Sequence, residues 1–182
     1  MGIVLIVIIV VIALLLVDLY NSLAGLRVRA DGAWSDIDVQ LKRRHDLIPN
    51  LVETVKGYAA HEKGTFENIA RYRSAAMSAT TVDEKAQAEG QLTQALRGLL
   101  AVAENYPQLQ ASEQFTSLQA SLNQTEDAIQ NSRRYYNAVV RDLNTKIVTF
   151  PSNIIAGMFS FQPRQFFQTE TAEDRVTPVV KF

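Results

Sequence analysis

The chain opens with an uninterrupted apolar run. Met1 to Val17 contains no charged or polar side chain, and Asp18 ends the run. A bilayer core of about 30 Å calls for roughly 20 apolar helical residues. Leu19 and Tyr20 carry the apolar character further, and a tyrosine suits the headgroup level of a membrane. The pattern therefore predicts a transmembrane anchor over residues 1–26.

A cleaved signal peptide is the alternative interpretation of this run. Such a peptide has a positively charged n-region, a shorter apolar core and a small-residue cleavage site. Here only Met1 and its amine provide an n-region, and Ser22-Leu23-Ala24 is a poor cleavage site. The length and the flanks favour an uncleaved, single-pass anchor.

The basic residues around the run predict its orientation. None precedes it, whereas Arg27 and Arg29 follow it, and Lys42, Arg43 and Arg44 come next. Under the positive-inside rule, this bias places the N-terminus outside and the body in the cytoplasm. The bias rests on few charges.

Beyond the anchor, apolar residues recur at steps of three and four positions, which is typical of an amphipathic helix. The first stripe predicts one helix from about residue 33 to residue 77. A kink is expected at Pro49, because proline removes a backbone donor. Only Gly25 and Gly32 argue against continuity with the anchor. The stripe consists of Trp34, Ile37, Leu41, Ile48, Val52, Val55, Ala59, Phe66, Ile69 and Ala76.

A capping-box pattern, Thr81-x-x-Glu84, predicts the start of a second helix after a turn at residues 78–82. Pro107 predicts its end, because the residue before a proline disfavours the helical conformation. The expected buried stripe of this helix is Leu92, Leu96, Leu99, Ala103 and Tyr106.

The third helix has the most regular pattern. Its main positions follow at seven-residue intervals: Phe115, Leu122, Ile129, Tyr136, Leu143 and Phe150. The companion positions are Leu118, Thr125, Ser132, Val139, Val140 and Ile147. A sustained repeat of this kind predicts left-handed, coiled-coil-like packing. Pro151 stops the helix near Thr149. The patterns together predict an all-α fold, with the N-terminal transmembrane helix followed by an elongated antiparallel bundle of three long helices over residues 27–150.

The C-terminal segment, residues 151–182, differs from the bundle. Five of the eight phenylalanines of the chain lie between positions 150 and 167. We expect a short helix near 153–159 and then an extended tail, whose end at 177–182 could add a strand to a partner. Two interpretations stay open for Phe159, Phe161, Phe166 and Phe167. They dock on a neighbouring subunit or the bilayer surface, or they fold back over their own bundle near Leu92 and Leu96.

Composition narrows the function. A net charge of -1 and a pI near 6.1 give no nucleic-acid footprint, which would need a strong basic bias. The absence of cysteine excludes disulfides, thiolate metal sites and a cysteine nucleophile. No glycine-rich phosphate loop and no nucleophile elbow occur.

The candidate metal ligands favour a structural interpretation. His61-Glu62 lacks the second histidine that a zinc-protease helix carries four residues after the first, since Thr65 stands there. His45 lies sixteen residues upstream of His61, and both histidines are expected to be solvated. Asp36 and Asp38 are two residues apart on different helical faces and suit the first turn of a helix. We therefore predict no catalytic, cofactor-binding or metal-binding residues.

Two further clusters also have a plain interpretation. Lys42-Arg43-Arg44 could bind anionic headgroups, but a solvated helix face paired with Asp38 and Asp46 is favoured. Arg133-Arg134-Tyr135-Tyr136 could be a nucleic-acid patch. Because Tyr136 already belongs to the heptad seam, a role in the core is favoured.

Several motifs resemble the bacterial LemA family. They are the stretch from Ala33-Trp34-Ser35-Asp36 to Gly57-Tyr58, then Ala103-Glu104-Asn105-Tyr106-Pro107, Thr125-Glu126, Tyr136-Asn137 and Phe150-Pro151-Ser152-Asn153. The resemblance covers nearly the whole chain. It implies a single-pass protein of the bacterial cell (inner) membrane, with a long helical bundle and no assigned catalytic residues. It further implies relatives that help to form magnetosome membranes, and others associated with HtpX-type membrane proteases.

The sequence and the resemblance together lead to one functional expectation. It is a membrane-anchored scaffold that forms homo-oligomers and contacts the lipid bilayer, with a role in membrane shaping or organisation. An adaptor or regulator of a membrane protease or of an envelope stress system is the alternative, and an enzyme is the least supported reading. No cofactor, no nucleic acid and no small-molecule substrate are expected.

Overall fold

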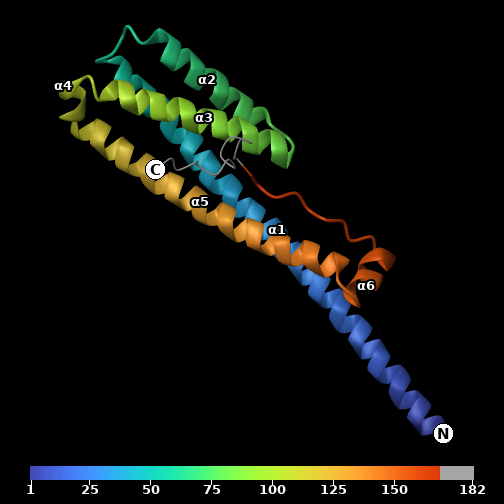
Figure 1. Cartoon of the computed structure of the whole chain (residues 1–182). Helices are drawn as coiled ribbons and strands as arrows, with labels where there is room; N and C mark the ends of the chain where they lie inside the picture. The colour runs from blue at the N-terminus through green and yellow to red at the C-terminus, as the bar shows by residue number, and fades with distance from the viewer. Residues whose placement is uncertain (169–182) are drawn as a thin grey trace, which may run out of the picture. The chain divides into compact units, whose positions relative to one another are not determined.

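The computed structural model describes residues 1–168, and that part of the chain contains helices and no strand (Figure 1). The helices are α1 (Gly2–Lys56), α2 (Lys63–Ser78), α3 (Val82–Ala103), α4 (Pro107–Gln110), α5 (Glu113–Val148) and α6 (Ser152–Met158). The all-α class with an N-terminal apolar helix is confirmed. The strand expected at 177–182 lies outside the described residues.

Helix α1 joins the apolar run to the body without a break. It continues through Gly25, Gly32 and Pro49, so the predicted continuity with the anchor is confirmed. By length and composition its first part is apolar enough to cross a membrane. The side chains of this part are exposed in the structure, from Ile3 at 80 % to Leu16 at 43 %.

The prediction of one helix over residues 33–77 is wrong. Helix α1 ends at Lys56, and α2 begins only at Lys63. Gly57 follows the last residue of α1, and Gly64 is the second residue of α2. Each glycine weakens a continuous helix by about 1 kcal/mol relative to alanine. The apolar period runs across this break because Ala59, in the connection, is itself buried.

The second predicted helix has the expected start. The Thr81 side chain accepts a hydrogen bond from the Glu84 backbone N–H, and the Glu84 carboxylate accepts one from the Thr81 N–H, which completes the capping box. Helix α3 ends at Ala103, before Pro107, which takes the first position of the one-turn helix α4.

Helix α5 follows the predicted heptads. Phe115, Leu122, Ile129, Tyr136 and Leu143 are all buried, whereas Phe150 lies beyond the helix end and is exposed. Helix α6 confirms the expected short helix after Pro151.

The contacts divide the chain into two compact units, and α1 and α5 contribute residues to both. The first unit comprises residues 1–39 and 130–166, and the second comprises 40–129 with the chain from 167 onward. The core of the second unit is built from α1, α2, α3, α4 and α5. It includes Ile48, Leu51, Val55, Phe66, Ile69, Leu92, Leu96, Leu99, Leu109, Phe115 and Leu122.

The first unit has a smaller core, in which Leu23 and Leu26 of α1 meet Leu143 of α5 and Ile155 and Ala156 of α6. The segment after α6 is held against its own chain. Asn144 accepts a hydrogen bond from the Arg164 N–H and donates one to the Arg164 carbonyl, both at 2.9 Å. Other hydrogen bonds join Arg164 to Asp31 and Tyr136 to the Gln165 carbonyl.

These contacts bear on whether the phenylalanines of the C-terminal segment pack on their own chain or dock elsewhere. Phe161 packs against the core of the first unit, and Phe167 is buried. Phe166 is half-buried, and Phe159 stays largely exposed. Folding back on its own chain is therefore confirmed for Phe167, whereas docking on a partner or the bilayer stays a prediction for Phe159, Phe161 and Phe166, which are not fully buried.

Candidate functional site

The second unit contains a buried cluster of charged side chains. Arg44 of α1 forms ion pairs with Glu89 of α3 and Glu126 of α5, the latter at 2.6 Å. The same guanidinium donates a hydrogen bond of 2.8 Å to the Thr93 hydroxyl. Arg44 is 1 % exposed and Glu89 2 %. Three helices thus place one cation and two carboxylates where the pattern of a helical bundle calls for apolar side chains.

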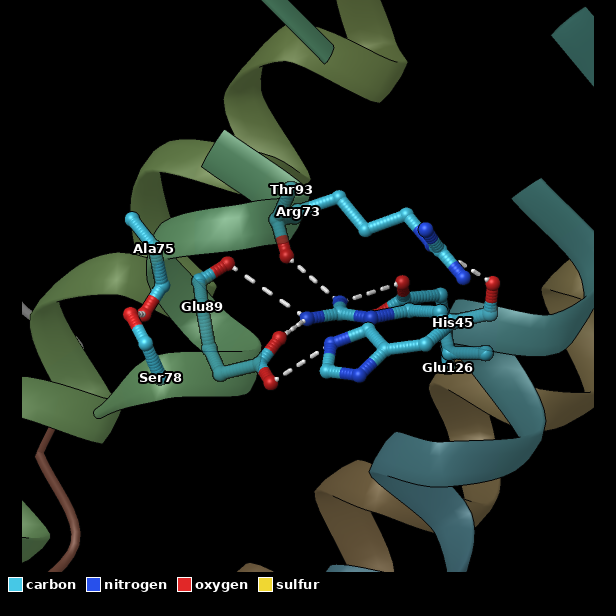
Figure 2. Close-up of polar contacts among 8 residues, drawn as sticks. His45, Arg73, Ala75, Ser78, Glu89, Thr93 and Glu126 are labelled. Carbon is cyan, nitrogen blue, oxygen red and sulfur yellow. Dashed lines mark hydrogen bonds and ion pairs between the residues drawn. The ribbon is translucent and has the colours of Figure 1, made fainter. Parts of the chain in front are cut away.

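His45 closes the other side of this cluster. Its Nε2 lies 2.9 Å from Oε1 of Glu89, so the two oxygens of the Glu89 carboxylate face Arg44 and His45 respectively. Figure 2 shows the imidazole and the carboxylate pointing toward each other. The backbone carbonyl of His45 accepts a hydrogen bond of 2.9 Å from Arg73 Nε, which brings α2 into the network. All four long helices of the second unit therefore contribute to the cluster.

The environment keeps the Glu89 carboxylate ionised. Burial raises the pKa of Glu89, but the hydrogen bond with His45 and the positive charge of Arg44 outweigh burial. The pKa of Glu89 therefore lies below its usual value. The cluster is therefore a buried group of paired charges, in which Arg44 lies between two carboxylates.

Apart from His45 Nε2 and Glu89 Oε1, which face each other at 2.9 Å, two buried polar atoms near the cluster have no hydrogen-bond partner within the described residues. They are Nε of Arg44 and Oε1 of Gln40, one helical turn earlier on α1. An unsatisfied buried group costs roughly 1–3 kcal/mol. The two terminal nitrogens of the Arg44 guanidinium are thus hydrogen-bonded, whereas its Nε is not.

The cluster is enclosed, which limits what it can do chemically. Two cavities of the described part lie elsewhere. One of about 190 Å³ is lined by Arg27, Leu143 and residues 160–164, and one of about 340 Å³ by Leu100, Ala103, Glu104, Gln110, Phe115 and Gln119. Neither lining combines a nucleophile with a base. The arrangement of the cluster suits the fixing of helices against one another.

The structure corrects the sequence reading of Arg44 and His45. Both were expected on a solvated face, yet both are buried, whereas their neighbours Lys42 and Arg43 are exposed as expected. A signal for this was present. Arg44 follows Leu41 by three positions and precedes Ile48 by four, and Glu89 precedes Leu92 by three, so both charges lie on predicted core faces. Opposite charges on two core faces indicate a buried pair.

The other candidate residues occupy ordinary positions. His61 and Asp36 are exposed, Asp38 is half-buried, and Tyr135 is 53 % exposed. Tyr136 is buried, and its ring centroid lies 5.4 Å from that of Trp34, which confirms its place in the seam. Within residues 1–168, no three histidines, cysteines or acids gather as a metal site would require.

Comparisons with known proteins agree with the motifs. The model of the LemA family matches residues 33–182. Magnetosome protein MamQ 2 of Paramagnetospirillum magneticum is 26% identical over 187 aligned positions, which cover 88% of this chain and 68% of the relative. Magnetosome protein MamQ of Magnetospirillum gryphiswaldense is 24% identical with the same coverage. Protein LemA of Metamycoplasma hominis is 29% identical, covering 84% of this chain and 70% of the relative.

Proposed function

Because the chain belongs to the LemA family, we propose that it is a structural protein without catalytic activity, anchored in the bacterial membrane and self-assembling there. The role that we infer is the organisation or shaping of that membrane. The similarity to proteins named as magnetosome proteins supports a structural role of this kind.

One observation carries the proposal. The exposed apolar part of α1 continues as a single helix into the buried charged cluster at Arg44. A soluble protein seldom leaves so large a contiguous apolar surface in water. Lipid would remove that surface from water. The basic residues beyond the anchor favour a cytoplasmic body, as the positive-inside rule requires.

A face of α1 beyond the anchor supports self-assembly. Val28 and Val39 are 68 % and 62 % exposed, and they are eleven residues apart, which places them on one face after three helical turns. Gly32 and Ser35 lie between them on the same face and are also exposed. A glycine allows another backbone to approach closely. A second copy of α1 could therefore pack along this face.

The test is the particle size of the full-length protein in mild detergent, by electron microscopy and light scattering. We expect large symmetric particles for the wild type. The Val28→Glu/Val39→Glu variant should keep its helicity and form smaller particles. Met77→Glu is the matched control, because Met77 is a similarly exposed apolar residue of α2, and it should leave the size unchanged.

One result would contradict self-assembly: wild-type particles of a single copy at all concentrations. Co-purification of such single copies with a second membrane protein at fixed stoichiometry would favour the adaptor role instead.

A further inference from the structure

Helix α6 and the residues around it form an uncharged segment. From Ile147 to Pro163 the chain carries no ionisable side chain, whereas the comparably short α2 carries Lys63, Glu67, Arg71 and Arg73. The outward side of this segment is apolar: Phe150, Ile154, Met158 and Phe159 are between 52 % and 76 % exposed. It is rare for a water-facing helix end both to lack charge and to expose four large apolar side chains.

The inward side of α6 fixes the segment to α1. Ile155 and Ala156 are buried against Leu23 and Leu26. The Tyr20 ring lies 4.7 Å from that of Phe159 and 5.9 Å from that of Phe161, between centroids. The Phe161 N–H donates to the Ala156 carbonyl and the Ser160 N–H to that of Gly157, a Schellman closure that turns the chain back after α6. The exposed apolar side is therefore held at the level of Tyr20.

The level of Tyr20 on α1 is where the surface of a membrane must lie if α1 crosses it. The hydrocarbon core takes roughly 20 helical residues, which from Gly2 leads to Asn21. From Val17 to Tyr20 the helix rises only about 4.5 Å. The headgroup region on each side of the core is roughly 5–8 Å thick. Phe159, in contact with Tyr20, thus falls at the boundary between the acyl chains and the headgroups.

We propose that Phe150, Ile154, Met158 and Phe159 form a membrane-interface wedge, which inserts into the headgroup region beside the anchor. The occupant of this face is the lipid bilayer. Aromatic side chains favour this depth, and the absence of charge removes the cost of desolvating an ion there. The wedge gives the protein a second attachment, so that the bilayer sets the tilt of α1 as well as its depth. This inference rests on the proposed anchor.

The experiment measures the depth of single tryptophans in the full-length protein reconstituted in phosphatidylcholine–phosphatidylglycerol vesicles. The chain has one tryptophan, so Trp34→Phe gives a silent background. Reporters are Phe159→Trp and, in case that change disturbs the contact with Tyr20, Met158→Trp. Leu14→Trp reports on the anchor. Tyr135→Trp is the aqueous control, since Tyr135 is 53 % exposed on α5 and lies about 20 Å along the helix from Val148.

Quenching by lipids brominated along the acyl chain decides the outcome. We expect both wedge reporters to be quenched severalfold more than Tyr135→Trp, and most strongly by bromine near the headgroup. If Leu14→Trp is quenched and neither wedge reporter is, the wedge is wrong while the anchor stands. If Leu14→Trp is not quenched, the anchor itself is wrong. Wedge reporters shielded from both brominated lipid and aqueous acrylamide would overturn the wedge in favour of a protein cover.

Discussion

Replacement of Arg44 by methionine tests whether the buried cluster holds the second unit together. Methionine keeps most of the volume of the arginine stem and removes the charge. The Glu89 carboxylate would then remain 2 % exposed, with the His45 imidazole as its one remaining side-chain partner among those described. Breaking a buried ion pair by removing one partner costs about 3–5 kcal/mol. Most of this cost belongs to Glu89, because the Glu126 side chain is 26 % exposed and can be hydrated.

The reverse change should cost less. In Glu89→Leu, Arg44 keeps Glu126 and Thr93 as partners, so we expect about 1–3 kcal/mol, the cost of a partly satisfied buried group. The double variant Arg44→Met/Glu89→Leu replaces the pair by apolar side chains, a change that is often close to neutral. It should therefore be more stable than Arg44→Met alone.

The assay is chemical unfolding of the full-length protein in detergent, followed by the helical signal in circular dichroism. Arg43→Met is the control, because Arg43 is exposed and a surface change should stay within about 0.5 kcal/mol. If the free-energy losses of the two single variants simply add in the double variant within about 0.5 kcal/mol, the residues are not coupled and the reasoning fails.

Three further predictions concern the seam, the pH dependence and the anchor. Leu122→Ala should lower the free energy of unfolding by about 2–5 kcal/mol, because Leu122 is 3 % exposed, whereas Gln130→Ala on the exposed side should change it little; equal losses would mean that the seam is misplaced. The folded-state pKa of Glu89 is lowered, so the ionised carboxylate adds its full contribution to the free energy of unfolding above the unfolded pKa of about 4.3, and this contribution is lost as the pH falls through the folded-state pKa. Glu89→Gln should therefore flatten the acid limb of a curve of stability against pH. An unchanged acid limb would refute this. Intact-mass analysis should find Met1 to Leu26 still attached, and a single cysteine placed in the body should resist an impermeant reagent in intact cells; labelling would reverse the orientation.

The helices could be predicted because each follows from local rules. The seven-residue repeat of α5 and the capping box of α3 involve residues close together in the sequence, and the structure keeps both. The break after Lys56 could not be read from the stripe, because Val55 before it, Ala59 within the connection and Phe66 after it all stay buried. Across the break, the apolar residues keep their helical spacing although the backbone turns. In the sequence, only Gly57 and Gly64 indicate that the helix is interrupted there.

The buried cluster could not be derived from local pattern alone. Arg44 and Glu89 are separated by 45 positions, and Arg44 and Glu126 by 82. A single charged residue on an apolar stripe is compatible with a helix end, a solvated edge or a buried pair. Only the placement of α1, α3 and α5 around the same core selects the buried pair. The tail is a similar case, since its phenylalanines divide between buried and exposed positions, and the sequence alone does not distinguish Phe167 from Phe159.

The cluster also explains how helices with similar apolar stripes keep one register. A slip of α5 by seven residues would preserve its seam but bring Gln119 or Arg133 to the position of Glu126, and a like slip of α3 would bring Val82 or Leu96 to that of Glu89. Each alternative takes one of the two carboxylates away from Arg44, and the slip that brings in Arg133 also places a second cation beside it. We infer that the cluster sets the register, a use for which buried polar groups are well attested. The double variant Arg44→Met/Glu89→Leu should then keep its helicity while cysteine pairs introduced for cross-linking between α1 and α5 react in more than one register. A single cross-linking register in that variant would show that apolar packing alone is sufficient.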